Sequence, residues 1–311
     1  DRDGRLDVIA GSFLPTEVHW YRNPGAESLR LGKQWQKFLL KDTGKSQNEG
    51  QLFEDLDGDG RPEWIVNSWK KDVPMAVYRL VERPEKGRLD KKQDQKKSSN
   101  PAKYLLAAHE LGPAGNGHGL AIGDLNGDGR KDVLVGQGWY EQPTQSPWSQ
   151  PWTFHADWEL HSSIPMIVTD LDQDGDSDII IGEGHDYGLS WWEQVEAEQP
   201  GGNLVFKTHE IDAAFSQPHT LAWVDLDGDD QPELITGKRY FAHNGRDPGG
   251  KEPPCLYYYE WDAEKRAFTR HTIDEGHIGC GLQIVAEDLN GDGKVDIAVA
   301  GKSGTYLLIA Q

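Results

Sequence analysis

The sequence predicts an all-β fold, namely a β-propeller of six four-stranded blades. Two observations support this prediction. An acidic unit recurs along the chain, and each copy is followed by a short run rich in β-branched residues. Complete copies of the unit begin at residues 55, 124, 170, 225 and 288, so they lie 46 to 69 residues apart. Repeats of this length that are built from short strands are typical of propeller blades.

Each repeat contains segments that are typical of four strands. A short apolar segment leads into the acidic unit, and a β-branched run, an aromatic run and a closing run follow it. Because these runs are short and bounded by Gly and Pro, strands are favoured over helices. The β-branched runs are 8–11, 64–67, 133–136, 179–182, 234–237 and 297–300. Aromatic runs include 139–142, 189–194 and 256–261, and closing runs include 206–211 and 268–273.

The first and last repeats are incomplete as blades. The chain opens inside a sixth acidic unit, DRDGRLD, so the first repeat lacks its inner strand, and the last repeat lacks its outer strand. A preceding segment could supply both strands, and a longer one would add a seventh blade. We therefore expect a single domain over 1–311 and a removed N-terminal segment. Residues 83–103 are charged and poor in apolar residues, which predicts a surface excursion.

Composition limits the partners of the chain. The net charge of −20 argues against nucleic acid and against an anionic membrane surface as partners. No apolar run approaches the length that spans a membrane, so no membrane insertion is expected. Cys255 and Cys280 could form a disulfide in an oxidising compartment, or they could be free buried thiols.

The acidic unit has the chemistry of a calcium loop. Oxygen ligands at positions 1, 3 and 5 can surround a hard cation, the residue at position 6 allows a sharp turn, and an acid at position 9 closes the site. Plain turns are the alternative, because Asp, Asn and Gly are common turn residues. The recurrence favours several structural Ca²⁺ ions. The predicted ligands are Asp55, Asp57, Asp59, Glu63, Asp124, Asn126, Asp128, Asp132, Asp170, Asp172, Asp174, Asp178, Asp225, Asp227, Asp229, Glu233, Asp288, Asn290, Asp292 and Asp296.

These units resemble the FG-GAP/VCBS repeat family of propellers over the whole chain. Three further stretches, 117–132, 182–194 and 237–249, are similar to a secreted bacterial subfamily, which is distantly similar to the propeller of aldos-2-ulose dehydratase. The resemblance implies a secreted or periplasmic protein. It also implies a possible chemistry, the elimination of water from a keto-sugar at a metal site. Propellers host many functions, so the fold alone does not decide the activity.

The face opposite the acidic loops is the predicted site. The inner and second strands of a blade run antiparallel, so the starts of the former and the ends of the latter meet there. Residues at equivalent places differ between blades, which is typical of a site on a repeated scaffold. By contrast, His109, His155, His209 and His271 recur in the closing runs, which predicts a structural role. His161 and His277 lie close before inner strands and could reach the site face.

Site roles follow from residue chemistry. We expect His118, His185 and His219 to hold one transition metal, such as Zn²⁺ or Mn²⁺, because imidazole suits such ions better than calcium. The expected catalytic residues are Lys238, Arg239, Tyr240, His243 and Asp186, which could act as acid or base or hold an oxyanion. Glu49, Trp139, Asn244 and Asp247 are expected to bind substrate, although Trp139 could instead pack within its blade.

Two functions from different classes remain open. The first is a secreted carbohydrate-active enzyme, a metal-dependent lyase or dehydratase acting on a keto-sugar or an oxidised glycoside. The second is a calcium-stabilised propeller that binds glycans or proteins without catalysis. The convergence of several histidines with Lys238 and Arg239 favours the enzyme, since a binding face does not require it.

Overall fold

The computed structural model describes most of the chain. The described residues are 1, 3–12, 14–44, 47–70, 72–82, 104–113, 117, 119–161, 164–196 and 203–311. The predicted excursion over 83–103 and the candidate ligand His118 lie outside them. Two compact units can be distinguished: one holds residues 1–118 and 143–153, and the other holds residues 119–142 and 154–311. Each unit is described by itself.

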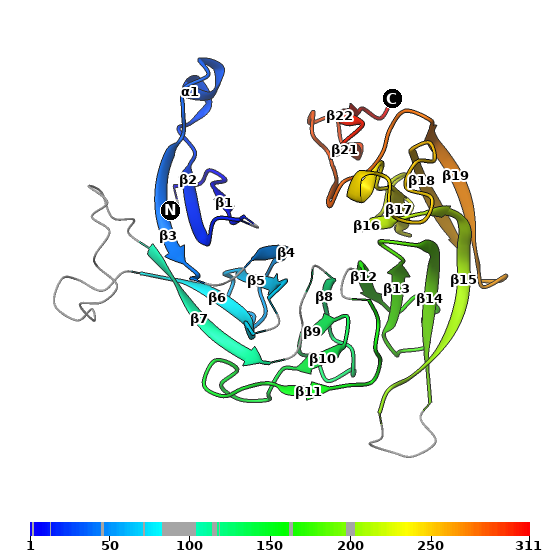
Figure 1. The fold of residues 1–311 in the computed structure, drawn as a ribbon, viewed down its shortest axis with the longest axis horizontal. Helices are drawn as coiled ribbons and strands as arrows, with labels where there is room; N and C mark the ends of the chain where they lie inside the picture. The colour runs from blue at the N-terminus through cyan, green and yellow to red at the C-terminus, as the bar shows by residue number, and fades with distance from the viewer. Residues whose placement is uncertain are drawn as a thin grey trace. The chain divides into compact units, whose positions relative to one another are not determined.

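The first unit contains two antiparallel sheets and the helix α1 (Ala26–Arg30). The first sheet has three strands and the second has four, each in sequence order (Figure 1). The strands of the first sheet are β1 (Val8–Ala10), β2 (Glu17–Arg22) and β3 (Gln36–Asp42). The strands of the second are β4 (Asn48–Glu54), β5 (Glu63–Ser68), β6 (Met75–Glu82) and β7 (Tyr104–Gly112).

The second unit contains the remaining sheets, all antiparallel and in sequence order. One is formed by β8 (Leu120–Gly123), β9 (Asp132–Val135), β10 (Gly138–Glu141) and β11 (Thr153–His155), whose first residue belongs to the first unit. The next is formed by β12 (Met166–Thr169), β13 (Asp178–Gly182), β14 (Tyr187–Val195) and β15 (Val205–Ser216). A third is formed by β16 (Pro218–Val224), β17 (Glu233–Lys238), β18 (Cys255–Asp262) and β19 (Ala267–Glu275). The last has three strands, β20 (Ile284–Glu287), β21 (Asp296–Gly301) and β22 (Gly304–Leu308).

The chain is therefore an all-β propeller, and its described residues form six blades, as the repeat predicts. The three-stranded first and last sheets confirm that the described part of the first blade lacks an inner strand and that of the last an outer strand. The second strand of a blade is the most buried element, since every residue of β5, β9, β13 and β17 is buried. Within the second unit, β13 has apolar side chains on both faces: Ile179 and Ile181 cluster with Leu134 of the preceding blade, and Ile180 clusters with Leu234 of the next.

The histidines of the outer strands pack against aromatic rings. His155 stacks on Trp139 with ring centroids 4.2 Å apart, and its Nε2 bonds Glu141 at 2.8 Å. His209 repeats the arrangement with Trp191 at 4.3 Å and Glu193 at 2.6 Å. The corresponding ring in the next blade, His271, stacks on Tyr258 at 4.7 Å. The predicted structural role of these repeated histidines is confirmed.

One cation links two neighbouring blades of the second unit. Arg266 lies in the turn between β18 and β19, and its Nη2 lies 2.8 Å from Asp172 and 2.7 Å from Glu193. Asp172 belongs to the acidic loop that precedes β13, and Glu193 lies on β14. The guanidinium therefore contacts the loop and the third strand of the preceding blade at once.

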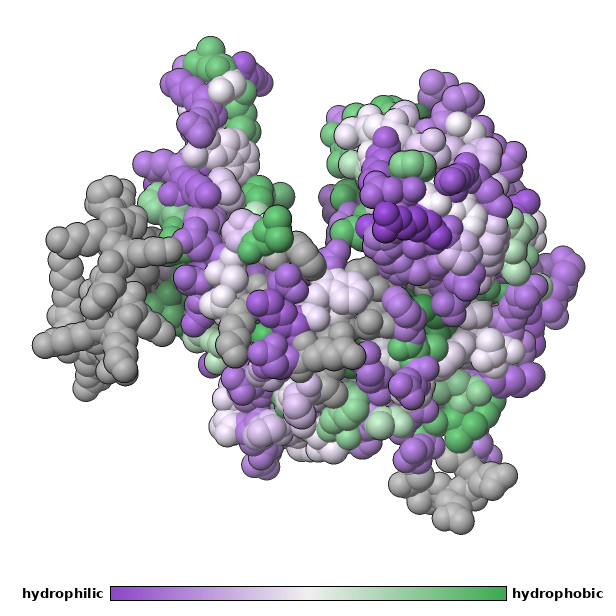
Figure 2. Space-filling view, viewed as in Figure 1, coloured by the Kyte–Doolittle hydropathy of each residue, from purple (hydrophilic) through white to green (hydrophobic). Residues whose placement is uncertain are grey.

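The surface of the second unit is mostly hydrophilic on the face drawn in Figure 2, including the part around the short helix η1 (Ala242–Asn244). Cys255 and Cys280 are buried free thiols, so the alternative of a disulfide is excluded in this structure. Among the described helices, none has the length and apolarity needed to cross a bilayer.

Candidate functional site

The acidic loops share one backbone conformation. The first acid of each loop accepts the amide N–H groups of positions 5 and 6, as Asp55 does from Asp59 at 3.1 Å and Gly60 at 2.8 Å. Position 6 has a positive φ, 80° at Gly60 and still 67° at Asp230, where the fifth loop has no glycine. The turn is therefore kept in the fifth loop, at the steric cost of a left-handed non-glycine residue.

Carboxylates gather in these loops at distances that suit one cation. Oxygen atoms lie within 4.8 Å of one another in three groups: Asp55 with Asp57 and Glu63, Asp170 with Asp172 and Asp174, and Asp225 with Asp227 and Asp229. Calcium prefers such oxygen donors, so the residues present fit the predicted ion. The calcium role itself stays a prediction.

The acid at position 9 has a second role within the fold. In five loops one of its oxygens accepts the amide N–H of position 2, for example Leu56 to Glu63 at 3.0 Å and Leu125 to Asp132 at 3.1 Å. Burial raises the pKa of Glu63 and of Asp132 to about 7 and that of Asp178 to about 6. This acid therefore anchors the loop to the second strand with or without an ion.

The second unit also contains a cluster of four imidazoles, which we call the histidine cluster: His161, His185, His219 and His243. His185 lies at its centre, in the turn between β13 and β14, and His219 lies on β16. The ring centroid of His185 is 5.4 Å from that of His161, 5.2 Å from that of His219 and 4.8 Å from that of His243. The structure thus brings together two of the three predicted metal ligands, His185 and His219, and adds two further rings.

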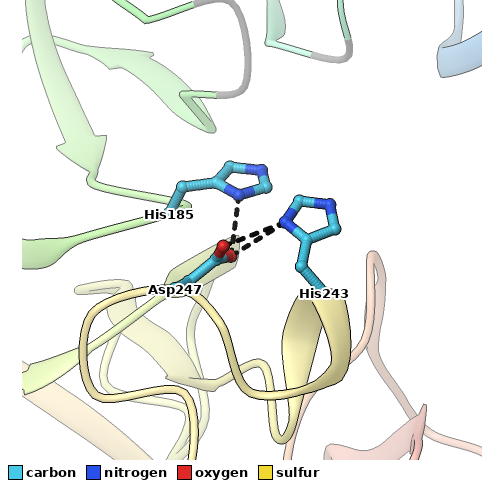
Figure 3. Close-up of side chains that lie close together, drawn as sticks. All are labelled: His185, His243 and Asp247. Atoms are coloured by element: carbon cyan, nitrogen blue, oxygen red, sulfur yellow. Dashed lines mark hydrogen bonds and ion pairs between the residues drawn. The ribbon is translucent and has the colours of Figure 1, made fainter.

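Asp247 binds two of these rings. Its Oδ2 lies 3.0 Å from Nδ1 of His185, and both its carboxylate oxygens lie 3.0 Å from Nδ1 of His243 (Figure 3). Burial lowers the pKa of His185, and the hydrogen bond to Asp247 opposes this shift. Burial acts to raise the pKa of Asp247, but the hydrogen bonds from His243 and His185 hold it below its usual range. The Asp247 carboxylate is therefore paired with the imidazole of His185, whose neutral form is favoured by burial.

Two adjacent basic residues at the end of β17 point to different partners. Arg239 donates from Nη1 to Nε2 of His219 at 2.9 Å and so belongs to the histidine cluster. Lys238 is 1% exposed, donates to Ser216 Oγ and lies 3.7 Å from Glu252. Burial lowers the pKa of Lys238. Its side chain points inward to Ser216, and its expected role as a base stays a prediction.

The loop that carries His243 and Asp247 has a strained backbone. Phe241, His243 and Asn244 have positive φ values of 51°, 44° and 60°, a conformation that non-glycine residues rarely adopt. Each such residue costs about 1–3 kcal/mol, and strain of this kind gathers at functional sites. Gln217, immediately before β16, also has a positive φ, of 61°. The surrounding structure therefore holds the cluster in place against local preference.

The other predicted site residues do not belong to the histidine cluster. Trp139 is 3% exposed, stacks on His155 and donates from Nε1 to Asp157 at 2.8 Å, so it packs within its blade and does not offer a ring to substrate. Glu49 lies on β4 in the first unit. Asp186 accepts the amide of Tyr187 at 2.8 Å and so stabilises its own turn. Tyr240 is half-buried, and Asn244 is exposed on η1.

Some residues of the site were not predicted from the sequence. His161 was expected only as a residue that could reach this face, and it lies in the cluster. Ser216 and Glu252 belong to no pattern in the sequence, yet both contact Lys238. Tyr187 donates its hydroxyl to Glu252 at 2.5 Å and so ties the loop 239–252 to β14. Polar contacts between strands far apart in sequence are not visible in a repeat pattern.

Comparison with known proteins agrees with the repeat. Residues 170–236 match the family model described as FG-GAP-like repeat, and they run from the acidic loop before β13 to β17. The match thus covers one repeat of the propeller. No match was found among curated proteins. One solved structure that the chain resembles is a lectin from Agrocybe aegerita, with a TM-score of 0.53 and 16% identity over 98% of this chain and 73% of the lectin. At this identity the likeness shows the fold alone.

Proposed function

We propose that this FG-GAP-repeat propeller binds carbohydrate at the histidine cluster. The observation that carries the proposal is the convergence of a guanidinium, several imidazoles and a carboxylate at the loops beside β14 and β16. Arg239, the half-exposed His243 and Asp247 offer donors and acceptors within one small region. Ligand sites in proteins combine a few such placed polar groups with apolar and aromatic surface.

Aromatic rings flank this polar group. Phe241 is 38% exposed and Tyr187 is 36% exposed, whereas the other described Phe, Tyr and Trp side chains of the second unit are buried or partly buried. An exposed ring beside hydrogen-bonding groups presents an apolar face to the C–H side of a sugar and leaves the hydroxyls to the polar groups. The Agrocybe aegerita lectin, which recognises non-reducing terminal N-acetylglucosamine, supports a sugar as the class of ligand.

The acidic loops complete the proposal. Bound Ca²⁺ would neutralise part of the net charge of −20 and tie the inner strand of each blade to the second strand, which keeps the loops beside β14 and β16 in register. We also propose a secreted or periplasmic location, where both calcium and external glycans are available.

Sugar binding is tested with a glycan array followed by calorimetric titration of the sugars that bind. Arg239→Gln should weaken binding about 10- to 100-fold, because a hydrogen bond from a charged donor contributes about 1.5–3 kcal/mol. Arg270→Gln is the matched control, since Arg270 bonds Asp212 at 2.9 Å on the outer strands. Absence of any binding sugar, or equal loss in both variants, would refute the proposal.

A metal-dependent lyase is the second candidate function. The specific observation in its favour is the set of two imidazoles and a carboxylate, which suits a Lewis-acidic metal. In such a reaction a base removes the proton next to the carbonyl of a keto-sugar, and a hydroxyl on the next carbon takes up a proton and leaves as water. Tyr240 could serve as the base, since His243 would hold the metal, and Arg239 could hold the oxyanion. Formation of an ultraviolet-absorbing enone from a keto-sugar or an oxidised glycoside would support catalysis over binding alone.

A further inference from the structure

We propose that Nδ1 of His185, Nδ1 of His243 and the carboxylate of Asp247 form a binding site for one first-row transition-metal ion, separate from the acidic loops. The site goes beyond the proposed sugar binding and does not depend on it. It also differs from the set expected from the repeat pattern, because His243 and Asp247 replace His118 and His219 as ligands to His185.

The spacing of the three donors supports the proposal. Two ligands of a tetrahedral Zn²⁺ with bonds of about 2.0–2.1 Å lie about 3.3 Å apart. Nδ1 of each imidazole lies 3.0 Å from an oxygen of Asp247, and all three donor atoms lie within 4.8 Å of one another. A small outward movement of the rings is therefore enough to admit an ion between them.

The kind of donor decides the class of metal. Two imidazole nitrogens and one carboxylate suit Zn²⁺, Mn²⁺, Fe²⁺ or Ni²⁺, whereas calcium takes oxygen ligands. The acidic loops, with oxygen donors alone, would take the calcium. Three protein ligands leave an open coordination position, and the His243 side chain, 54% exposed, places that position next to solvent.

The backbone around these ligands is preorganised. His243 has φ 44° and ψ 37°, which places its ring over the ring of His185 with an interplanar angle of 17°. The loop is fastened on the other side, where Gln217 donates from Nε2 to the carbonyl of Pro248 at 3.1 Å, next to Asp247. These contacts hold His243 and Asp247 toward His185, which comes from a different blade.

The alternative is a purely structural hydrogen-bonded trio. A metal site would bind Zn²⁺ and a purely structural trio would not, so an experiment on the full chain without any sugar distinguishes the two. The protein is dialysed against a chelator, the acidic loops are filled with excess Ca²⁺, and Zn²⁺ alone is titrated by calorimetry, with Co²⁺ as an optical probe of coordination. Two variants remove ligands: His243→Ala at an exposed position, and Asp247→Asn, which keeps an oxygen acceptor for the hydrogen bonds. His277→Ala is the control, because His277 pairs with Asp274 at 3.2 Å and belongs to no three-donor group of the described residues.

We expect about one Zn²⁺ per wild-type chain in the presence of Ca²⁺. Each ligand variant should lose at least ~10-fold in affinity, since even outer partners of metal sites contribute that much, and His277→Ala should bind as the wild type does. Melting curves in Ca²⁺ check that all variants are folded. The proposal is overturned if calcium-loaded wild type takes up no Zn²⁺, or if His243→Ala and Asp247→Asn bind it as tightly as the control.

Discussion

Asp178→Ala tests whether the ninth position of the acidic unit anchors the fold by itself. Asp178 is 1% exposed and accepts three hydrogen bonds: from the amide of Gln194 at 2.8 Å, from Nε1 of Trp191 at 2.9 Å and from the amide of Leu171 at 3.3 Å. Alanine removes the acceptor and leaves three buried donors without it. Each orphaned donor costs about 1–3 kcal/mol.

The three costs do not add fully, because the donors are neighbours and relax together. We therefore expect a loss of about 3–5 kcal/mol in the free energy of unfolding. For a chain of this size, that loss corresponds to a fall in melting temperature of about 6–10 °C. The measurement is thermal and urea unfolding, followed by fluorescence, in Ca²⁺ and again in excess chelator.

Asp174→Ala is the matched control in the same loop. Asp174 is exposed and accepts the amide of Asp176 at 2.9 Å. It should cost little in chelator and more in Ca²⁺, where it would be a ligand. Asp178→Ala should cost several kcal/mol in both conditions. If Asp178→Ala and the wild type unfold together in chelator, the acid at position 9 acts only through the ion and our reasoning is refuted.

Three further predictions concern the whole chain, an outer strand and the thiols. Excess chelator should lower the melting temperature of the wild type, since calcium binds only the folded loops, and an unchanged curve would exclude the calcium loops. His209→Ala should cost about 1–3 kcal/mol, because it removes the stacking on Trp191 and the bond to Glu193, and it should leave Zn²⁺ binding unchanged. Burial raises the pKa of Cys255 to about 11, so the folded thiol should resist alkylation at pH 8 until the chain is unfolded. Because this pKa lies above the unfolded value of about 8.5, the contribution of Cys255 to stability is present below pH 8.5 and is lost as the pH rises toward 11, which unfolding at pH 7 and pH 10 measures.

The sequence predicted the blades because their signals are local and repeated. The run 179–182 and its equivalents show β-branched residues directly after a turn, and the structure places strands there, as β13 (Asp178–Gly182) shows. A structural role for His155 and His209 was likewise predicted from recurrence alone, although their stacking on Trp139 and Trp191 was not. A feature that occurs in every blade recurs several times along the chain, so the repeats of a single sequence can be compared with one another.

The histidine cluster was predicted only in part, because its contacts depend on side-chain direction. His185 and His219 were assigned to one face correctly, since the order of strands decides which loops meet. Asp247 was not recognised as the partner of His243. The positive φ values of His243 and Asn244 change the direction of the loop, and the residue types alone do not predict these φ values. The contact of Lys238 with Ser216 was not predicted, because β17 continues through Lys238 and its side chain alternates inward.

If the acidic loop before β13 binds calcium, the position of Arg266 couples that loop to the next blade. Its guanidinium, whose pKa is raised by the hydrogen bond to Asp172, serves as counter-charge for a loop that belongs to the preceding repeat. An ion entering that loop competes with Arg266 for Asp172, so binding there loosens the β18–β19 turn from its neighbour while Glu193 retains its hold. The repeats are then not independent units whose stabilities simply add. The blade of β12 to β15 and the blade of β16 to β19 would instead be coupled as nearest neighbours through Arg266.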